Sequence, residues 1–90
     1  MASQLTVETV EERGDYHHVW FRDPDTFEQI RTPEWATNIA RSVVPESKVR
    51  MGGDDDGEWI VQSVLIPTEG VDGGDDASRN ALEIVTKISD

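Results

Sequence analysis

The chain has 90 residues, and its 19 Asp and Glu residues outnumber its 8 Lys and Arg residues, which gives a formal net charge of -11. It contains no Cys, which excludes disulfides, zinc-thiolate clusters and a thiol nucleophile. At this length we expect one domain over residues 1–90, with a small core and a narrow folding margin. Only 36% of the residues are apolar, but they fall into blocks with strand and helix periods, which indicates a folded domain.

The kind of charge indicates the solvent and the compartment. The N-terminal residues lack the basic region and apolar stretch of a signal peptide, and no run approaches the ~18 apolar residues of a membrane span. Most of the basic residues are Arg, and Lys is nearly absent. Such an acidic surface stays hydrated in molar salt and repels itself in dilute buffer. We therefore expect a cytoplasmic protein of a halophile, without membrane association.

The first part of the chain is typical of strands. Residues 5–11 alternate loosely and predict an edge strand, and residues 16–22 predict an interior strand with two partly apolar faces. Asp23 followed by Pro24 has the form of a helix N-cap with proline at the first helical position. We therefore expect a short helical turn after Asp23.

The clearest helix comes next. Thr32 and Pro33 open it, and Pro45 ends it. Six apolar residues at helical spacing form one face: Trp35, Ala36, Ile39, Ala40, Val43 and Val44. We expect this face, including Trp35, to pack in the core, with Arg41 on the opposite polar face.

A hairpin and a final helix complete the predicted order. Residues 47–52 and 58–66 predict two strands that pair antiparallel across the acidic, Gly-rich loop at 53–57. Either Asp75 or Asp76 is suited to cap the last helix. The fold class that buries these apolar stripes is α+β. It is a two-layer sandwich of about four mainly antiparallel strands, with two main helices packed on one face.

No residue pattern indicates a catalytic, metal or cofactor site. His17 and His18 are adjacent in a strand, so they point to opposite faces and cannot share a metal ion. The acidic run 54–56 lacks the spacing and the later Glu of a calcium loop. No Ser-His-Asp order is evident, and Ser63 is most simply a small strand residue. We therefore expect no enzyme, no metal and no cofactor.

One candidate interaction surface is the sheet face that the helices leave uncovered. We expect this face to hold His18, Trp20, Trp59 and Val61 and to mediate homodimerisation or binding of a protein partner. Trp59 is also a candidate core residue, because it begins a buried strand. The favoured interpretation is a non-enzymatic interaction module.

A second candidate surface is a basic patch of Arg31, Arg41, Lys48 and Arg50. It supports the alternative of a nucleic-acid-associated or regulatory domain. Nucleic acid is the less favoured partner, because its affinity for basic residues falls steeply with salt. Pairing of these side chains with carboxylates of the same chain is the simpler explanation.

The stretch FRDPDTFEQIRTPEWATNIARSVV, followed by SKVRMGG and EWIVQSVLIP, resembles a family of small acidic proteins of haloarchaea over roughly residues 16–67. The resemblance implies a halophilic cytoplasm. It implies no activity, because no catalytic or ligand residues are assigned in that family.

Overall fold

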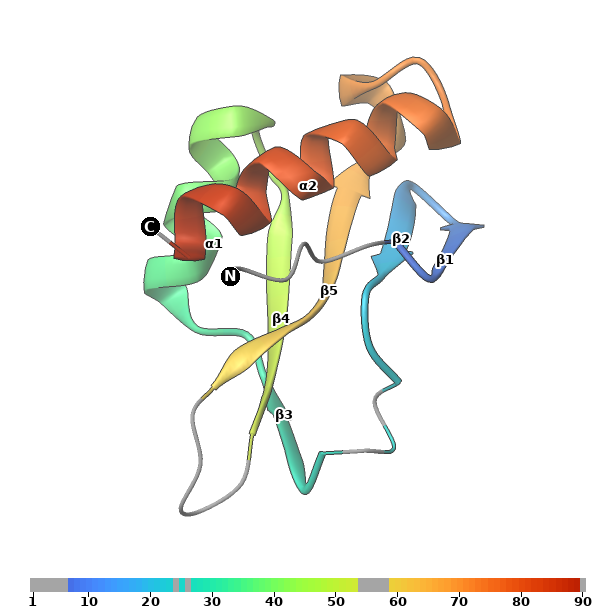
Figure 1. Ribbon diagram of the computed structural model, residues 1–90. Helices are drawn as coiled ribbons and strands as arrows, with labels where there is room; N and C mark the ends of the chain where they lie inside the picture. The colour runs from blue at the N-terminus through green and yellow to red at the C-terminus, as the bar shows by residue number, and fades with distance from the viewer. Residues whose placement is uncertain (1–6, 24, 26, 54–58, 90) are drawn as a thin grey trace.

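The structure is a computed structural model, and it describes residues 7–23, 25, 27–53 and 59–89. In chain order its elements are β1 (Thr9–Arg13), β2 (Tyr16–Trp20), β3 (Gln29–Arg31), α1 (Glu34–Val43), β4 (Lys48–Gly53), β5 (Ile60–Pro67), the 3-10 turn η2 (Thr68–Gly70) and α2 (Gly74–Ser89) (Figure 1). Neither helix within these ranges offers an apolar stretch of the length that a bilayer crossing requires.

The strands of the described residues form one antiparallel sheet in the order β1-β2-β5-β4-β3. α2 packs on β1, β2 and β5, whereas α1 packs beside β4 and against α2. Both helices share one buried apolar cluster with one face of the sheet. The architecture is therefore the two-layer α+β sandwich that the sequence predicts, with five strands in place of about four.

One face of the sheet supplies the core. The strand register places Val19 beside Val64 and Val64 beside Val49, and all three side chains are fully buried. The helices meet these valines largely through small residues: Ala36, Ala40, Ala77 and Ala81. Because successive strand residues point to opposite faces, the residues between the core valines lie on the other side of the sheet. We call that side the helix-free face.

The predicted short helical turn forms at its start and gives way to a strand at its end. Asp23 accepts a hydrogen bond from the backbone N–H of Asp25 at 2.9 Å, so a local turn of the capping kind forms there. Farther along, β3 pairs with the end of β4 and places Ile30 opposite Gly52. The edge of β4 gives this segment backbone hydrogen-bond partners, and that pairing outweighs the local helical signal. The prediction is therefore confirmed at Asp25, which has a 3-10 conformation, and wrong at Ile30, which lies in β3.

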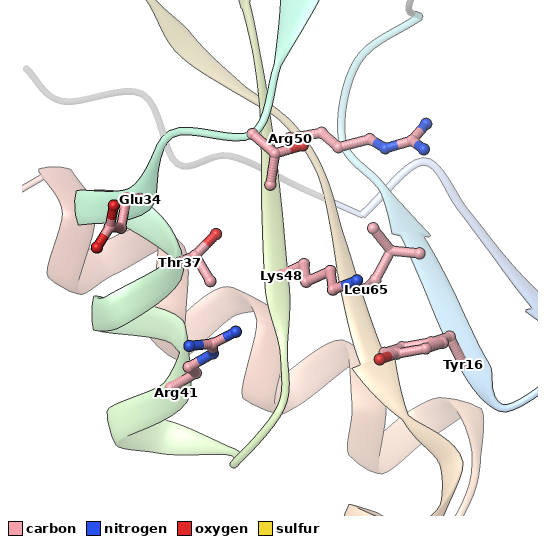
Figure 2. Close-up of a pocket in the computed structure, with 8 residues that line it drawn as sticks. Tyr16, Glu34, Thr37, Arg41, Lys48, Arg50 and Leu65 are labelled. Atoms are coloured by element: carbon pink, nitrogen blue, oxygen red, sulfur yellow. The ribbon is translucent and has the colours of Figure 1, made fainter.

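The exposed side of α1 also differs from the prediction. Trp35 is 52% exposed, whereas Ala36 and Ala40 are fully buried. β3 pairs with only one half of β4, and α1 runs alongside the other half (Figure 2). The side of α1 that carries Thr37 therefore also contacts the sheet. Thr37 is buried there, although the sequence places it on the polar face of the helix. The prediction that Trp35 lies in the core is wrong, because α1 occupies the edge of the sheet and turns Trp35 outward.

The remaining predicted elements are confirmed, with shifts at their ends. β4 and β5 pair antiparallel as expected. α2 begins at Gly74, so Asp75 and Asp76 lie in its first turn, and the prediction that one of them is the N-cap is wrong. The side chain of Asp76 accepts a hydrogen bond from the backbone N–H of Asp72 at 3.1 Å. The start of the first predicted strand and the hairpin loop compared with a calcium loop lie outside the described residues.

Candidate functional site

The helix-free face carries polar, charged and aromatic side chains. The strand register brings together Glu11 and Arg13 of β1, Tyr16, His18 and Trp20 of β2, Ser63 and Leu65 of β5, and Lys48 and Arg50 of β4. The centre of the opposite face is apolar and buried, with Val19, Val49, Val64 and Ile66 fully buried. Any function that the sheet performs outside the core therefore uses this face.

A hydrogen-bonded chain lies at the centre of the face. His18 Nε2 lies 2.8 Å from Ser63 Oγ, and Ser63 Oγ donates to Gln62 Oε1 at 2.8 Å. A serine hydroxyl has a single hydrogen, so Nε2 of His18 is the donor to Ser63. Gln62 in turn donates from Nε2 to the backbone carbonyl of Arg22 at 2.9 Å. The sequence does not indicate these hydrogen bonds, because His18 and Ser63 are 45 positions apart.

The surroundings of His18 favour its neutral form. Burial lowers the pKa of the imidazole below its usual 6.5, the nearby cations Arg50 and Arg13 lower it further, and the carboxylate of Glu11 opposes them. The ring packs on Trp20, with the two ring centroids 4.6 Å apart. His18 therefore serves as a neutral hydrogen-bond donor within this face.

The pair of Ser63 and His18 does not form an accessible nucleophile and base. Ser63 is fully buried, and its hydrogen is directed to Gln62 rather than to His18. A nucleophilic serine needs its oxygen exposed to substrate and its proton within reach of the base. The geometry of this pair is that of a structural hydrogen bond. Among the described residues there is also no group of three His, Asp or Glu side chains that could hold a metal ion.

The structure separates the four residues predicted as an interaction surface. His18 and Trp20 lie together on the helix-free face, but His18 is 7% exposed and Val61 is buried. Trp59 is half-buried and packs against the core cluster, with the guanidinium of Arg31 5.0 Å from its ring centroid. The indole Nε1 of Trp20 is buried and has no hydrogen-bond partner in the described part of the chain.

Three of the four residues of the predicted basic patch converge on one pocket. We call it the α1–β4 pocket, and its lining consists of Tyr16, Thr32, Glu34, Thr37, Arg41, Lys48, Arg50 and Leu65. Its cavity volume is about 560 Å³. Arg31 is not part of it and lies over Trp59. The sequence shows that Lys48 and Arg50 share a strand face, but it does not show that Arg41 of the neighbouring helix joins them.

Figure 2 shows how the lining is arranged. Thr37 and Arg41 project from α1 toward β4, while Lys48 extends from β4 across the sheet toward Tyr16. The ammonium of Lys48 lies 5.8 Å from the centroid of the Tyr16 ring. The lining holds three positive side chains and one negative one, Glu34. A net positive pocket thus forms in a chain whose formal net charge is -11.

The three cations and the Thr37 hydroxyl of the pocket lack partners among the described residues. In the described ranges the one ion pair joins Arg13 to Glu11, so Arg41, Lys48 and Arg50 have no carboxylate partner there. The Thr37 hydroxyl is buried and also has no hydrogen-bond partner among the described residues. The carboxylate pairing that the sequence favoured for these cations is therefore absent from the described residues.

Comparisons of the chain with models of protein families, with curated proteins and with solved structures give no match. The function is therefore inferred from the geometry and charge of the helix-free face.

Proposed function

We propose that the protein is a non-enzymatic binding module whose α1–β4 pocket takes an anionic ligand. The observation that carries this proposal is that Arg41, Lys48 and Arg50 line one pocket without a carboxylate partner among the described residues. A bound anion would receive charge-assisted hydrogen bonds from such side chains. The described part of the chain holds many other carboxylates, so the lack of a carboxylate partner for these cations within it is consistent with a binding role.

The same geometry favours a small anion over a nucleic acid. A nucleic-acid backbone needs an extended basic surface, whereas these cations line one concave site, and Arg31 lies apart from them. In the molar salt that we propose for this protein, the affinity of a long polyanion falls most steeply, because it depends on many phosphate contacts. A small anion makes few such contacts and loses less affinity with salt.

The proposal is tested by titrating the protein with inorganic pyrophosphate in molar KCl while following backbone amide NMR shifts. We expect saturable shifts centred on Thr37, Arg41, Lys48 and Arg50. The double variant Arg41→Gln/Lys48→Gln should weaken binding by about tenfold or more, because it removes two charge-assisted contacts. Arg79→Gln is a matched control, since Arg79 is an exposed residue of α2 outside the pocket. Shifts spread over the surface, or an equal loss in Arg79→Gln, would contradict the proposal.

Self-association through the helix-free face is a second candidate function. It is supported by the buried indole Nε1 of Trp20, which lacks a hydrogen-bond partner in the described residues on a face that no helix covers. A second copy could bring an acceptor to this donor. Light scattering in molar KCl tests it. A dimer mass for the natural chain and a monomer mass for Trp20→Ala are expected, and an unchanged mass in Trp20→Ala would refute this face as the interface.

For its compartment we propose the cytoplasm of a halophile. The support is compositional: the chain is strongly acidic, poor in Lys and free of Cys. Such a compartment supplies the salt that screens repulsion between the acidic side chains.

A further inference from the structure

We infer that the ligand of the α1–β4 pocket is a small organic phosphate monoester, a dianionic phosphate group joined to an organic body. The inference rests on the proposed anion site and names its ligand class. Three properties of the pocket support it: the balance of its charges, its hydrogen-bond donors and its size.

The charge of the lining matches a dianion. Arg41, Lys48 and Arg50 outweigh Glu34 by two positive charges. A phosphate monoester carries about -1.5 to -2 at neutral pH, whereas a carboxylate, a sulfate ester or a phosphodiester carries a single negative charge. Glu34 stands at the first turn of α1 and disfavours ligands with further negative groups at that end of the pocket. The balance therefore favours a terminal phosphate over a carboxylate, a diester or a polyanion.

The donors of the lining suit phosphate oxygens. Arginine binds phosphate through two parallel N–H groups, and lysine supplies a point charge with three donors. Thr37 adds a hydroxyl that is buried and without a hydrogen-bond partner among the described residues. Buried polar groups are normally hydrogen-bonded, so an unpartnered hydroxyl at the wall of a positive pocket indicates an acceptor that the ligand brings. Arg41 and Thr37 both project from the same side of α1 toward β4 (Figure 2).

The size of the pocket requires more than a bare phosphate. A cavity of about 560 Å³ lies within the range of about 300–1,000 Å³ that holds small organic ligands. On the side away from α1 its wall is formed by the half-buried Leu65 and the ring of Tyr16 (Figure 2). A phosphate held between Arg41 and Lys48 leaves its organic substituent over these two side chains. The ligand is therefore an organic phosphate with an apolar or aromatic part next to the phosphate.

The experiment compares three probes of matched shape or charge at about pH 8, above the second phosphate pKa of about 6. Phenyl phosphate carries both the dianion and the ring, phenyl sulfate carries the ring with one charge, and inorganic phosphate carries the dianion without the ring. We expect phenyl phosphate to bind about tenfold or more tightly than either of the others. Amide NMR shifts of the pocket residues in molar KCl provide the dissociation constants.

Four variants separate the contributions of the Thr37 hydroxyl, the apolar wall and the Lys48 charge to binding. Thr37→Val removes the hydroxyl at nearly constant shape and should weaken phenyl phosphate and inorganic phosphate alike by about tenfold, whereas Thr37→Ser keeps the hydroxyl and the affinity. Leu65→Ala should remove most of the preference for phenyl phosphate over inorganic phosphate without changing the affinity for inorganic phosphate. Lys48→Gln should reduce the discrimination between phenyl phosphate and phenyl sulfate. An amide spectrum of the native type confirms that each variant is folded.

The outcomes distinguish this inference from the proposed function. If pyrophosphate binds at the pocket but phenyl phosphate binds no more tightly than inorganic phosphate or phenyl sulfate, the ligand class is wrong and the anion site stands. If none of the anions shifts the pocket residues, both are wrong. A preference for phenyl phosphate over inorganic phosphate that persists in Leu65→Ala, or an unchanged affinity for both phosphates in Thr37→Val, would also overturn the inference, because the pocket residues would not be the source of binding.

Discussion

His18 links the hydrogen-bonded centre of the helix-free face to its charges. The groups that face it are Arg50 on β4 and Glu11 and Arg13 on β1, and burial adds to the effect of the two cations. The folded state therefore holds the imidazole neutral at a pH where the unfolded chain, with a pKa near 6.5, already binds a proton. Since the unfolded state then holds more protons, this group makes the protein less stable as the pH falls below 6.5.

The charge environment of His18 is tested by NMR titration of its imidazole signals. We expect a pKa below 6.5 in the natural chain. Arg50→Gln should raise this pKa, because it removes a neighbouring cation, and Glu11→Gln should lower it, because it removes the carboxylate that opposes the cations. Shifts of the opposite sign in these variants would show that the two side chains do not face the ring as the structure places them. Because Arg50 also lines the pocket, a bound anion should raise the pKa of His18 and so report on binding.

At the scale of elements, the packing of the segment before β3 on β4 depends on a glycine. An added Cβ at Gly52 would overlap the ring of Phe27, which packs directly on the glycine backbone. Gly52→Ala should therefore lower the free energy of unfolding by about 1–3 kcal/mol, the usual cost of overpacking a filled site. Gly74→Ala is the control, because a Cβ at the start of α2 meets only Val10 at an ordinary 3.7 Å. Alanine there should be neutral or slightly stabilising. Denaturant unfolding measures both, and equal stabilities for the two variants would contradict the close contact.

The elements that sequence periodicity describes well are those whose partners are local or whose apolar pattern is long. β4, β5 and the two helices follow from their own residues, and so does the antiparallel hairpin. β3 does not, because a three-residue edge strand is held by hydrogen bonds to β4 and not by its own propensity. The prediction that Trp35 lies in the core fails for a related reason. Periodicity gives an apolar side of α1, but the position of the helix at the sheet edge decides which part of that side is covered.

The candidate site was predictable only in part for the same physical reason. Strand alternation predicts that Lys48 and Arg50 share a face, and helical spacing places Arg41 on the polar face of α1. Thr37, one turn before Arg41 on the same helix, could have been placed with it from the four-residue spacing. The contributions of Tyr16 and Leu65 depend on the order of β2, β5 and β4 in the sheet. No local pattern carries that order, so the pocket emerges only when the strands are assembled.

At the scale of the whole molecule, charge is distributed unequally. The chain as a whole has a formal net charge of -11, yet the lining of the α1–β4 pocket is positive by two. A field of this shape repels anions at long range and attracts them within the pocket. Salt reduces the long-range repulsion first, because interactions across solvent beyond the Debye length are the most screened. Molar salt therefore removes the long-range repulsion of anions more completely than it weakens the contacts of a bound anion within the pocket.

The same net charge predicts a stability that rises with salt. Between ~0.1 M and ~1 M KCl the Debye length falls from about 10 Å to about 3 Å, which screens most of the repulsion between surface carboxylates. We expect Tm to rise by several degrees over this range, since about 1 kcal/mol corresponds to about 4–8 °C in a domain of this size. The triple variant Glu8→Gln/Glu12→Gln/Glu83→Gln removes three charges at exposed positions. It should have the higher Tm in dilute buffer and a smaller rise with KCl, as measured by thermal unfolding. An equal rise in Tm for the variant and the natural chain would contradict this prediction. It would mean that salt acts by strengthening apolar burial in general and not by screening the acidic surface.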